Sequence, residues 1–134
     1  MLLEGKKHQD ERGIITYNND FDASQIKRIY TIENQSTDFI RGWQGHKIEQ
    51  RWFTCMKGSF EISVMALDNF ENPSKDFTVR KYLLTDEALT YLHIPPGCIT
   101  AVQAIQKESK LLVLTDYRLG EINDEYRFSL DYFK

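Results

Sequence analysis

The feature that most limits the fold of this chain is a series of short apolar segments separated by turn-forming residues. Within several segments apolar side chains recur at every second position, as Phe60, Ile62 and Val64 do around Glu61 and Ser63. A period of two is typical of a strand with one buried face and a different opposite face. The segments predicted as strands are 26–32, 51–57, 59–67, 76–84, 89–94, 99–105 and 110–117.

Turn signals divide these strands. Gly58 predicts a tight hairpin between 51–57 and 59–67, and Pro95-Pro96-Gly97 ends the strand before it. Seven or more short strands at a spacing of roughly 10 residues indicate a sandwich or a barrel. No helix of three turns is predicted, and residues 119–134 are expected to form one helical turn or a tail packed on the barrel. The 134 residues contain no repeat or linker, so a single domain is predicted over 1–134.

Composition excludes several classes of protein. A hydrophobic content of 41% with 13% aromatic residues is typical of a globular chain. The net charge is −3 and no Lys/Arg stripe is present, which argues against nucleic acid as a partner. No stretch of about 18 apolar residues predicts a membrane span, and the first residues lack an apolar signal region, so we expect a soluble cytoplasmic protein. Cys55 and Cys98 are interpreted as reduced, buried side chains rather than as a disulfide.

The segment Arg41-Gly42-Trp43-Gln44-Gly45-His46 combines residue types that suit chemistry. The guanidinium of Arg41 fits a phosphate or a carboxylate, and His46 can act as an acid or a base near neutral pH. The alternative is a bulged edge strand with a surface arginine and a hydrogen-bonded histidine. Two alternatives also stay open for the next candidates. Arg51 either points into a barrel mouth or covers apolar neighbours at the surface, and Thr100 either contacts a ligand or is simply a strand residue.

A catalytic metal site usually needs three converging protein ligands. His46 and Glu49 provide two candidates, and Gln44 between the glycines is a poor ligand for most transition metals. We therefore expect no metal.

The strings RGWQGHKIEQ, MKGSFEI, LHIPPG and VLTDY, in this order, resemble the bacterial dTDP-4-oxo-6-deoxyglucose 3,4-ketoisomerases. These are the WxcM-like sugar isomerases within the RmlC-like cupins, and the resemblance extends from Asp10, in the string DERG, to about Phe133. The chain is also similar to the dTDP-4-dehydrorhamnose 3,5-epimerases, in which an inward lysine occupies the position of Arg51. The resemblance implies an all-β cupin barrel of the RmlC-like jelly-roll type, a homodimer, and a small-molecule nucleotide sugar as the ligand.

This sequence departs from the family pattern at two places. Gln44 stands where the family has a histidine, and Ile99-Thr100 replaces a Trp-His pair. Gln cannot take up a proton at neutral pH. The resemblance therefore leaves His46 as the base, beside other implied roles: Gln44 hydrogen-bonding the sugar or its ketone, Tyr117 as a candidate acid, Thr100 as a binding hydroxyl, Arg41 and Arg51 holding the diphosphate or developing charge, and Arg12 reaching the nucleotide phosphate, in some relatives from the partner subunit.

The function implied is the isomerisation or epimerisation of a dTDP-linked 4-keto-6-deoxysugar. Proton removal next to a ketone needs neither metal nor redox cofactor, because the ketone itself acidifies the C–H bond, so no cofactor is expected. The alternative is a cupin that binds a sugar nucleotide without catalysis, and a metal cupin is the third hypothesis.

Overall fold

The structure, a computed structural model, describes residues 1–75 and 78–133. Within these residues the one helix is a short 3₁₀ helix, η1 (Ala23–Gln25), so the prediction of an all-β fold is confirmed. The strands are β1 (Leu2–Leu3), β2 (Lys6–Asp10), β3 (Gly13–Tyr17), β4 (Arg28–Ile32), β5 (Ile40–His46), β6 (Arg51–Lys57), β7 (Ser59–Ala66), β8 (Arg80–Thr85), β9 (Tyr91–Ile94), β10 (Cys98–Ala104), β11 (Lys110–Thr115) and β12 (Glu125–Arg127).

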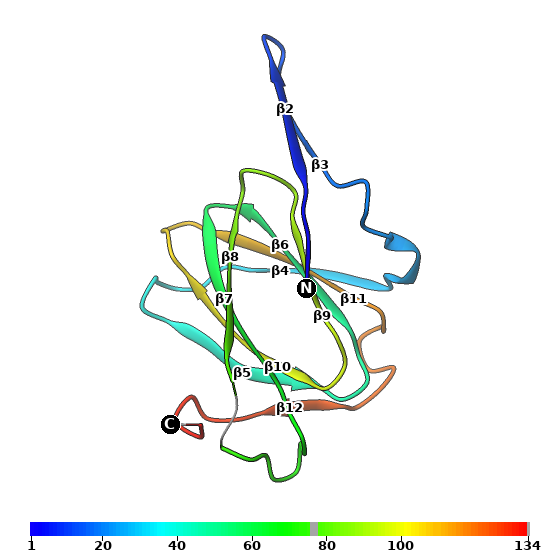
Figure 1. Cartoon of the computed structure of the whole chain (residues 1–134), viewed down its shortest axis with the longest axis vertical. Coiled ribbons are helices and arrows are strands. Elements are labelled where there is room, and N and C mark those ends of the chain that lie inside the picture. The colour runs from blue at the N-terminus through cyan, green and yellow to red at the C-terminus, as the bar shows by residue number, and fades with distance from the viewer. Residues whose placement is uncertain (76–77, 134) are drawn as a thin grey trace.

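Two five-stranded antiparallel sheets face each other and form a jelly-roll barrel (Figure 1). One sheet has the order β1-β9-β6-β11-β4 and is called sheet A here, and the other has the order β12-β5-β10-β7-β8 and is called sheet C. β2 and β3 form a separate hairpin that projects from one end of the barrel, whereas β12 crosses the other end (Figure 1). The jelly-roll barrel implied by the sequence is thus confirmed.

Gly58 does not form the predicted hairpin. β6 pairs with β9 and β11 in sheet A, whereas β7 pairs with β10 and β8 in sheet C. With φ of 78°, Gly58 instead carries the chain around a corner from one sheet to the other. Its N–H donates to Asp86 and the N–H of Ser59 donates to Ser109, so the corner is bonded to neighbouring turns. A corner and a hairpin both require a glycine-like turn, which is why the local sequence did not distinguish them.

Other predicted strands agree with the structure to within a few residues. The prediction for 76–84 includes residues 76–77, which lie outside the described residues, and β8 begins at Arg80. The strand β5 is flanked on both sides, by β10 and β12, so it is not an edge strand, although its pairing with β10 does shift register between Thr100 and Val102. Of the two alternatives for 119–134, the structure shows the tail packed on the barrel over 119–133, and this tail also contributes the strand β12.

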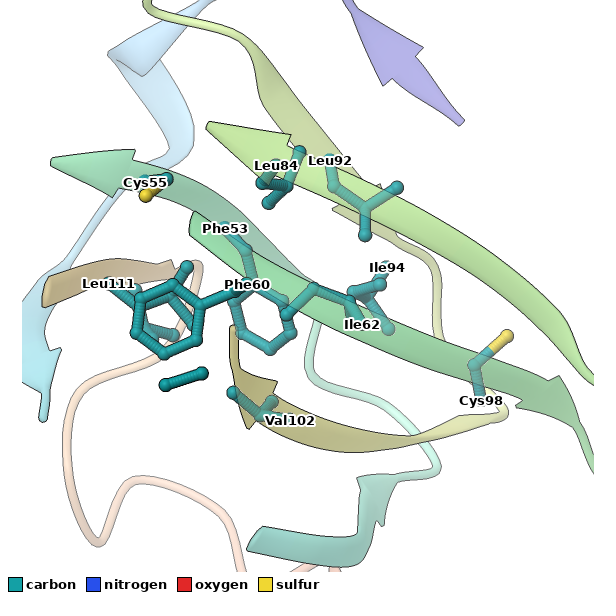
Figure 2. Packing of buried hydrophobic residues seen from close by; sticks show 12 residues of the cluster. Phe53, Cys55, Phe60, Ile62, Leu84, Leu92, Ile94, Cys98, Val102 and Leu111 are labelled. Carbon is teal, nitrogen blue, oxygen red and sulfur yellow. The ribbon is translucent and has the colours of Figure 1, made fainter. Parts of the chain in front are cut away.

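The barrel interior is apolar over most of its length. Phe53, Phe60 and Ile62 lie at its centre between the two sheets, and the surrounding side chains come from β8 to β11 (Figure 2). Cys55 and Cys98 are both buried and free, as predicted, and lie at opposite sides of this cluster (Figure 2). Burial raises the pKa of Cys98 and raises that of Cys55 to about 11.

The outer face of each sheet is also covered. Residues of the C-terminal segment, including Phe128 and Phe133, pack on Trp43 and Met65 of sheet C. Phe21 and Ile26 pack on Trp52 of sheet A. The cover that the C-terminal segment provides over sheet C explains why the outer face of β7 carries the apolar Met65 and is not purely polar. No helix among the described residues has the length and apolar character that a membrane crossing requires.

Candidate functional site

Two adjoining cavities open at the barrel end that carries Arg51, the first residue of β6. The larger has a volume of about 410 Å³ and the smaller about 220 Å³. Arg28, Arg51, Leu119 and Glu125 line both, so the two cavities share a wall. A third cavity, of about 750 Å³, lies elsewhere between Val64, Tyr82 and Cys98 and contains none of the predicted site residues.

The structure brings together five of the seven predicted site residues. Arg41, Gln44, Arg51 and Thr100 line the larger cavity, and His46 lines the smaller cavity next to Arg51. Register explains the grouping. Thr100 of β10 lies opposite Gln44 of β5, and paired residues in antiparallel strands project to the same face. That face is the barrel interior.

Arg12 and Tyr117 are not part of either lining. Arg12 lies at the exposed turn of the β2–β3 hairpin, where its guanidinium binds Asp10 at 2.7 Å. β11 ends at Thr115, whose hydroxyl donates to the Tyr117 carbonyl at 2.8 Å, so Tyr117 lies beyond the strand. The Tyr117 ring instead faces the ammonium of Lys27 at 5.9 Å. Their roles in the site remain predictions.

His46 lies in a buried polar network, with only 8% of its side chain exposed. Its Nδ1 is 2.8 Å from Oδ1 of Asp124. Because an ionised carboxylate can only accept, Nδ1 carries a proton in this pair, and in the neutral imidazole the lone pair is then on Nε2. Nε2 has no hydrogen-bond partner among the described residues and lies 3.4 Å from Oε2 of Glu49. His46 thus lies between two carboxylates with Nε2 buried beside Glu49, and its neutral form can accept a proton at that atom.

Asp124 also fixes the loop that follows β5. Its Oδ2 accepts hydrogen bonds from the backbone N–H groups of Ile48 and Glu49, at 2.7 and 2.9 Å. Burial alone would raise the pKa of Asp124, but the hydrogen bond from His46 and the two backbone hydrogen bonds together hold it below its ordinary value. Asp124 is thus held ionised, in the form that orients the imidazole.

Arg51 points into the barrel and is paired there. Its Nε donates to Oε2 of Glu49 at 3.0 Å, and 12% of its side chain is exposed. Of the two alternatives for Arg51, the structure selects the inward one, with Glu49 as the anion that a buried cation requires. Glu49 therefore bridges His46 and Arg51.

Gln44 is held by a second carboxylate. Its Nε2 donates to Oε1 of Glu125 at 3.0 Å, and the same oxygen accepts from Nε of Arg127 at 2.6 Å. The pairing of β12 with β5 places Glu125 opposite His46 and Arg127 opposite Gln44. All four side chains consequently share the inner face of sheet C.

The opposite wall, from sheet A, is cationic and aromatic. The guanidinium carbon of Arg28 lies 4.4 Å from the ring centre of Tyr30, and that of Arg51 lies 5.9 Å from it. Burial raises the pKa of Tyr30, and the two guanidinium groups lower it to a smaller extent. With Arg41 and Arg127, four arginines line the larger cavity, an arrangement suited to a polyanionic ligand such as a diphosphate.

Sequence reasoning missed the residues that complete this site, above all Asp124 and Glu125. Asp124 directly precedes β12 and Glu125 begins it, in a segment with no strong apolar run. The alternation of Glu125 and Arg127 with Tyr126 and Phe128 is the period-two signal that could have predicted this strand. Among the residues that the structure describes, no three His, Cys, Asp or Glu side chains are grouped as a metal site would require.

Comparisons with solved structures agree on the fold. The 3,4-ketoisomerase QdtA from Thermoanaerobacterium thermosaccharolyticum, solved in complex with TDP-4-keto-6-deoxyglucose, is 23% identical with a TM-score of 0.73, over 99% of this chain and 89% of that chain. A 3,4-ketoisomerase from Helicobacter canadensis is 27% identical with a TM-score of 0.73, over 99% and 92%. The RmlC epimerase of Mycobacterium tuberculosis is 16% identical with a TM-score of 0.74, over 96% and 68%.

No curated protein matches this sequence. The model of one protein family does, along the whole chain from residue 1 to residue 134, and that family is described as "FdtA: WxcM-like, C-terminal". With its jelly-roll barrel and its likeness to ketoisomerase and epimerase structures, this chain belongs to the FdtA, WxcM-like C-terminal family and has the fold of the RmlC-like cupins.

Proposed function

We propose that this protein isomerises or epimerises a dTDP-linked 4-keto-6-deoxysugar by proton transfer next to the ketone. The observation that carries the proposal is the pairing of His46 with Asp124 beside a cavity lined by four arginines. Family membership and the TDP-sugar ligand of the similar QdtA structure support this substrate class.

In the proposed reaction His46 is the base. Its Nε2 takes the proton from the carbon adjacent to the carbonyl, and Asp124 orients the ring and stabilises the imidazolium that forms. The resulting enediolate is stabilised by cationic donors, for which Arg51 and Arg41 are positioned. A proton then returns to the neighbouring carbon. The chemistry needs no metal or redox cofactor, because the ketone acidifies the C–H bond.

Binding is assigned to the larger cavity. Arg41 and Arg51 would contact the diphosphate or the charge that develops on the sugar, and Thr100 and Gln44 would hydrogen-bond sugar oxygens. The guanidinium of Arg41 makes a long hydrogen bond of 3.4 Å to Asn34 and lies 5.7 Å from the ring centre of Phe39, and a ligand that binds it would replace these two contacts.

A second candidate function is binding of the sugar nucleotide without catalysis. It is favoured by Gln44, which fills an interior position beside His46 with a group that cannot exchange protons and is already bonded to Glu125. The two candidates differ in one measurable event, the exchange of a sugar carbon-bound hydrogen with solvent.

The test is to incubate the protein with dTDP-4-keto-6-deoxyglucose in heavy water and follow the sugar by NMR. We expect deuterium to enter the ring, and we expect His46→Asn to reduce that rate by about 10²-fold or more. Glu108→Gln, at a titratable side chain that is 83% exposed and lines neither cavity, is the control. Tight binding of dTDP without exchange in the unaltered protein would establish the second candidate instead.

We further propose that two copies associate and that the protein is cytoplasmic. The β2–β3 hairpin projects from the barrel with Ile14 and Ile15 more than half exposed, which suits contact with a second copy that Arg12 would then reach. Free thiols at Cys55 and Cys98 accord with a reducing compartment. Light scattering of the purified chain measures its mass directly, and a monomeric mass would contradict the association.

A further inference from the structure

Glu125 is a carboxylate that lines both cavities, and no sequence motif singled it out. It begins β12 directly opposite His46, and 40% of its side chain is exposed. We propose that Glu125 is a second proton-transfer group of this site, which carries a proton between two neighbouring oxygens of the sugar while His46 acts at carbon. The inference deepens the proposed function and rests on its isomerase form.

The two carboxylates next to Glu125 are less accessible than it is. Both oxygens of Asp124 accept hydrogen bonds, and Glu49, which is 8% exposed, contacts both Arg51 and His46 through Oε2. Gln44 has no proton to give or take, and Tyr117 lies outside both linings.

Glu125, in contrast, has one oxygen fixed and one available. Oε1 accepts hydrogen bonds from Gln44 of the adjacent strand β5 and from Arg127 of the same strand β12, and these two donors hold the carboxylate in place. Oε2 makes no hydrogen bond to any residue that the structure describes. A carboxylate fixed at one oxygen and open at the other is suited to repeated proton transfer with a bound sugar.

The proton balance of a 3,4-keto shift requires such a group. Removal of the hydrogen on carbon 3 by His46 leaves an enediolate, with a hydroxyl on carbon 3 and a negative oxygen on carbon 4. Glu125 takes the hydroxyl proton as the carbon 3 carbonyl forms, and the double-bond electrons take the proton from His46 at carbon 4. Glu125 then gives its proton to the oxygen on carbon 4. His46 and Glu125 both end in their starting forms, the neutral imidazole and the carboxylate.

The test compares Glu125→Gln with the unaltered protein on dTDP-4-keto-6-deoxyglucose in heavy water. The amide can still hydrogen-bond but cannot carry a proton. We expect deuterium exchange at carbon 3 to persist, because His46 is intact, and formation of the 3-keto isomer to fall by about 10²-fold or more. Glu121→Gln is the matched control, since Glu121 is about as exposed, pairs with Lys27 and lines neither cavity.

Several outcomes would overturn the inference. Isomer formation at the unaltered rate would remove Glu125 from the reaction, and loss of carbon exchange with dTDP binding intact would place it at carbon rather than oxygen. If Glu125→Gln does not bind dTDP, the test uses two variants with a shorter side chain, Glu125→Asp and Glu125→Asn. The carboxylate variant must then form isomer faster than the amide variant, and equal rates would refute proton transfer by Glu125. Absence of both exchange and isomer in the unaltered protein would instead refute the proposed function itself.

Discussion

The two ends of the barrel interior are built from the same strands, but one end is lined by apolar side chains and the other by charged and polar side chains. On β6, Phe53 and Cys55 belong to the apolar cluster, whereas Arg51, on the same face two residues earlier, lies in a network of charges. On β10, Val102 and Ala104 belong to the apolar cluster, and Val102 and Thr100 both line the larger cavity. Phe53 and Val102 therefore stand where the apolar cluster meets this cavity.

The comparison shows what each end requires of the rest of the chain. The apolar end is formed by strand residues alone, because alternation is sufficient to bury them. The polar end also needs charged side chains from segments other than the strands that form the apolar end. Its carboxylates come from the loop after β5, as Glu49, and from the C-terminal segment, as Asp124 and Glu125. The apolar end holds the two sheets together, and the polar end collects the charged side chains.

The largest effect is expected from breaking the apolar end. Phe60→Ala removes a ring that is 0% exposed, and it should lower the free energy of unfolding by about 3–5 kcal/mol. Denaturant unfolding measures the loss. Met56→Ala, at a side chain that is 48% exposed, is the control and should change stability by about 0.5 kcal/mol or less. Similar losses in both variants would mean that Phe60 is not packed as described.

A smaller effect is expected from the polar end. Asp124→Asn replaces a carboxylate that accepts hydrogen bonds from His46, Ile48 and Glu49, and it should lower stability by about 1.5–3 kcal/mol at pH 7. Asp20→Asn, in an exposed turn, is the control. We expect the loss of unfolding free energy to be larger for Phe60→Ala than for Asp124→Asn. A larger loss for Asp124→Asn would mean that the polar end contributes more to stability than the apolar end.

The effect of Asp124 should also depend on pH. Its folded-state pKa lies below the unfolded value of 3.8, so the stability it contributes is fully present above the unfolded pKa and is lost as the pH falls through the folded-state pKa. The difference between the unaltered protein and Asp124→Asn should therefore be constant near neutral pH and vanish in strong acid. A difference that grows on acidification would contradict the assignment.

The smallest signal is expected from the thiol in the apolar end. With a pKa of about 11, Cys55 is ionised to roughly 0.1% at pH 8, so iodoacetamide should not modify it in the folded protein. Mass spectrometry of the alkylated chain gives the measurement, and unfolding in denaturant should release full reactivity. Rapid modification of folded protein would show that the apolar end is open to solvent.

The sequence predicted the apolar end better than the polar end, for a physical reason. Alternation is a local property, and it located β6, β7 and β11 to within two residues. Gly58 shows the limit of local signals, since a glycine that turns the chain does not say which sheet the next strand joins.

Site residues show the same division. Arg41, Gln44, His46 and Arg51 lie close together in sequence, the family resemblance grouped them, and the structure places them around the two adjoining cavities. Asp124 lies 78 residues from its partner His46, and nothing local relates the two. Tyr117 was expected in the site as part of a strand to 117, but β11 ends at Thr115 and the chain turns away from the interior.

The segment after β11, which follows Thr115, contributes both to the outer cover of sheet C and to the polar cavities. Its apolar residues, such as Phe128 and Leu130, shield the outside of sheet C, while Asp124 and Glu125 reach the interior wall on the other side of the same sheet. Substitutions in this short surface segment can therefore alter the polar cavities while the strands of the barrel stay unchanged. For the same reason, proteolytic cleavage within the segment should remove Asp124 and Glu125 from the cavities while the apolar cluster stays intact.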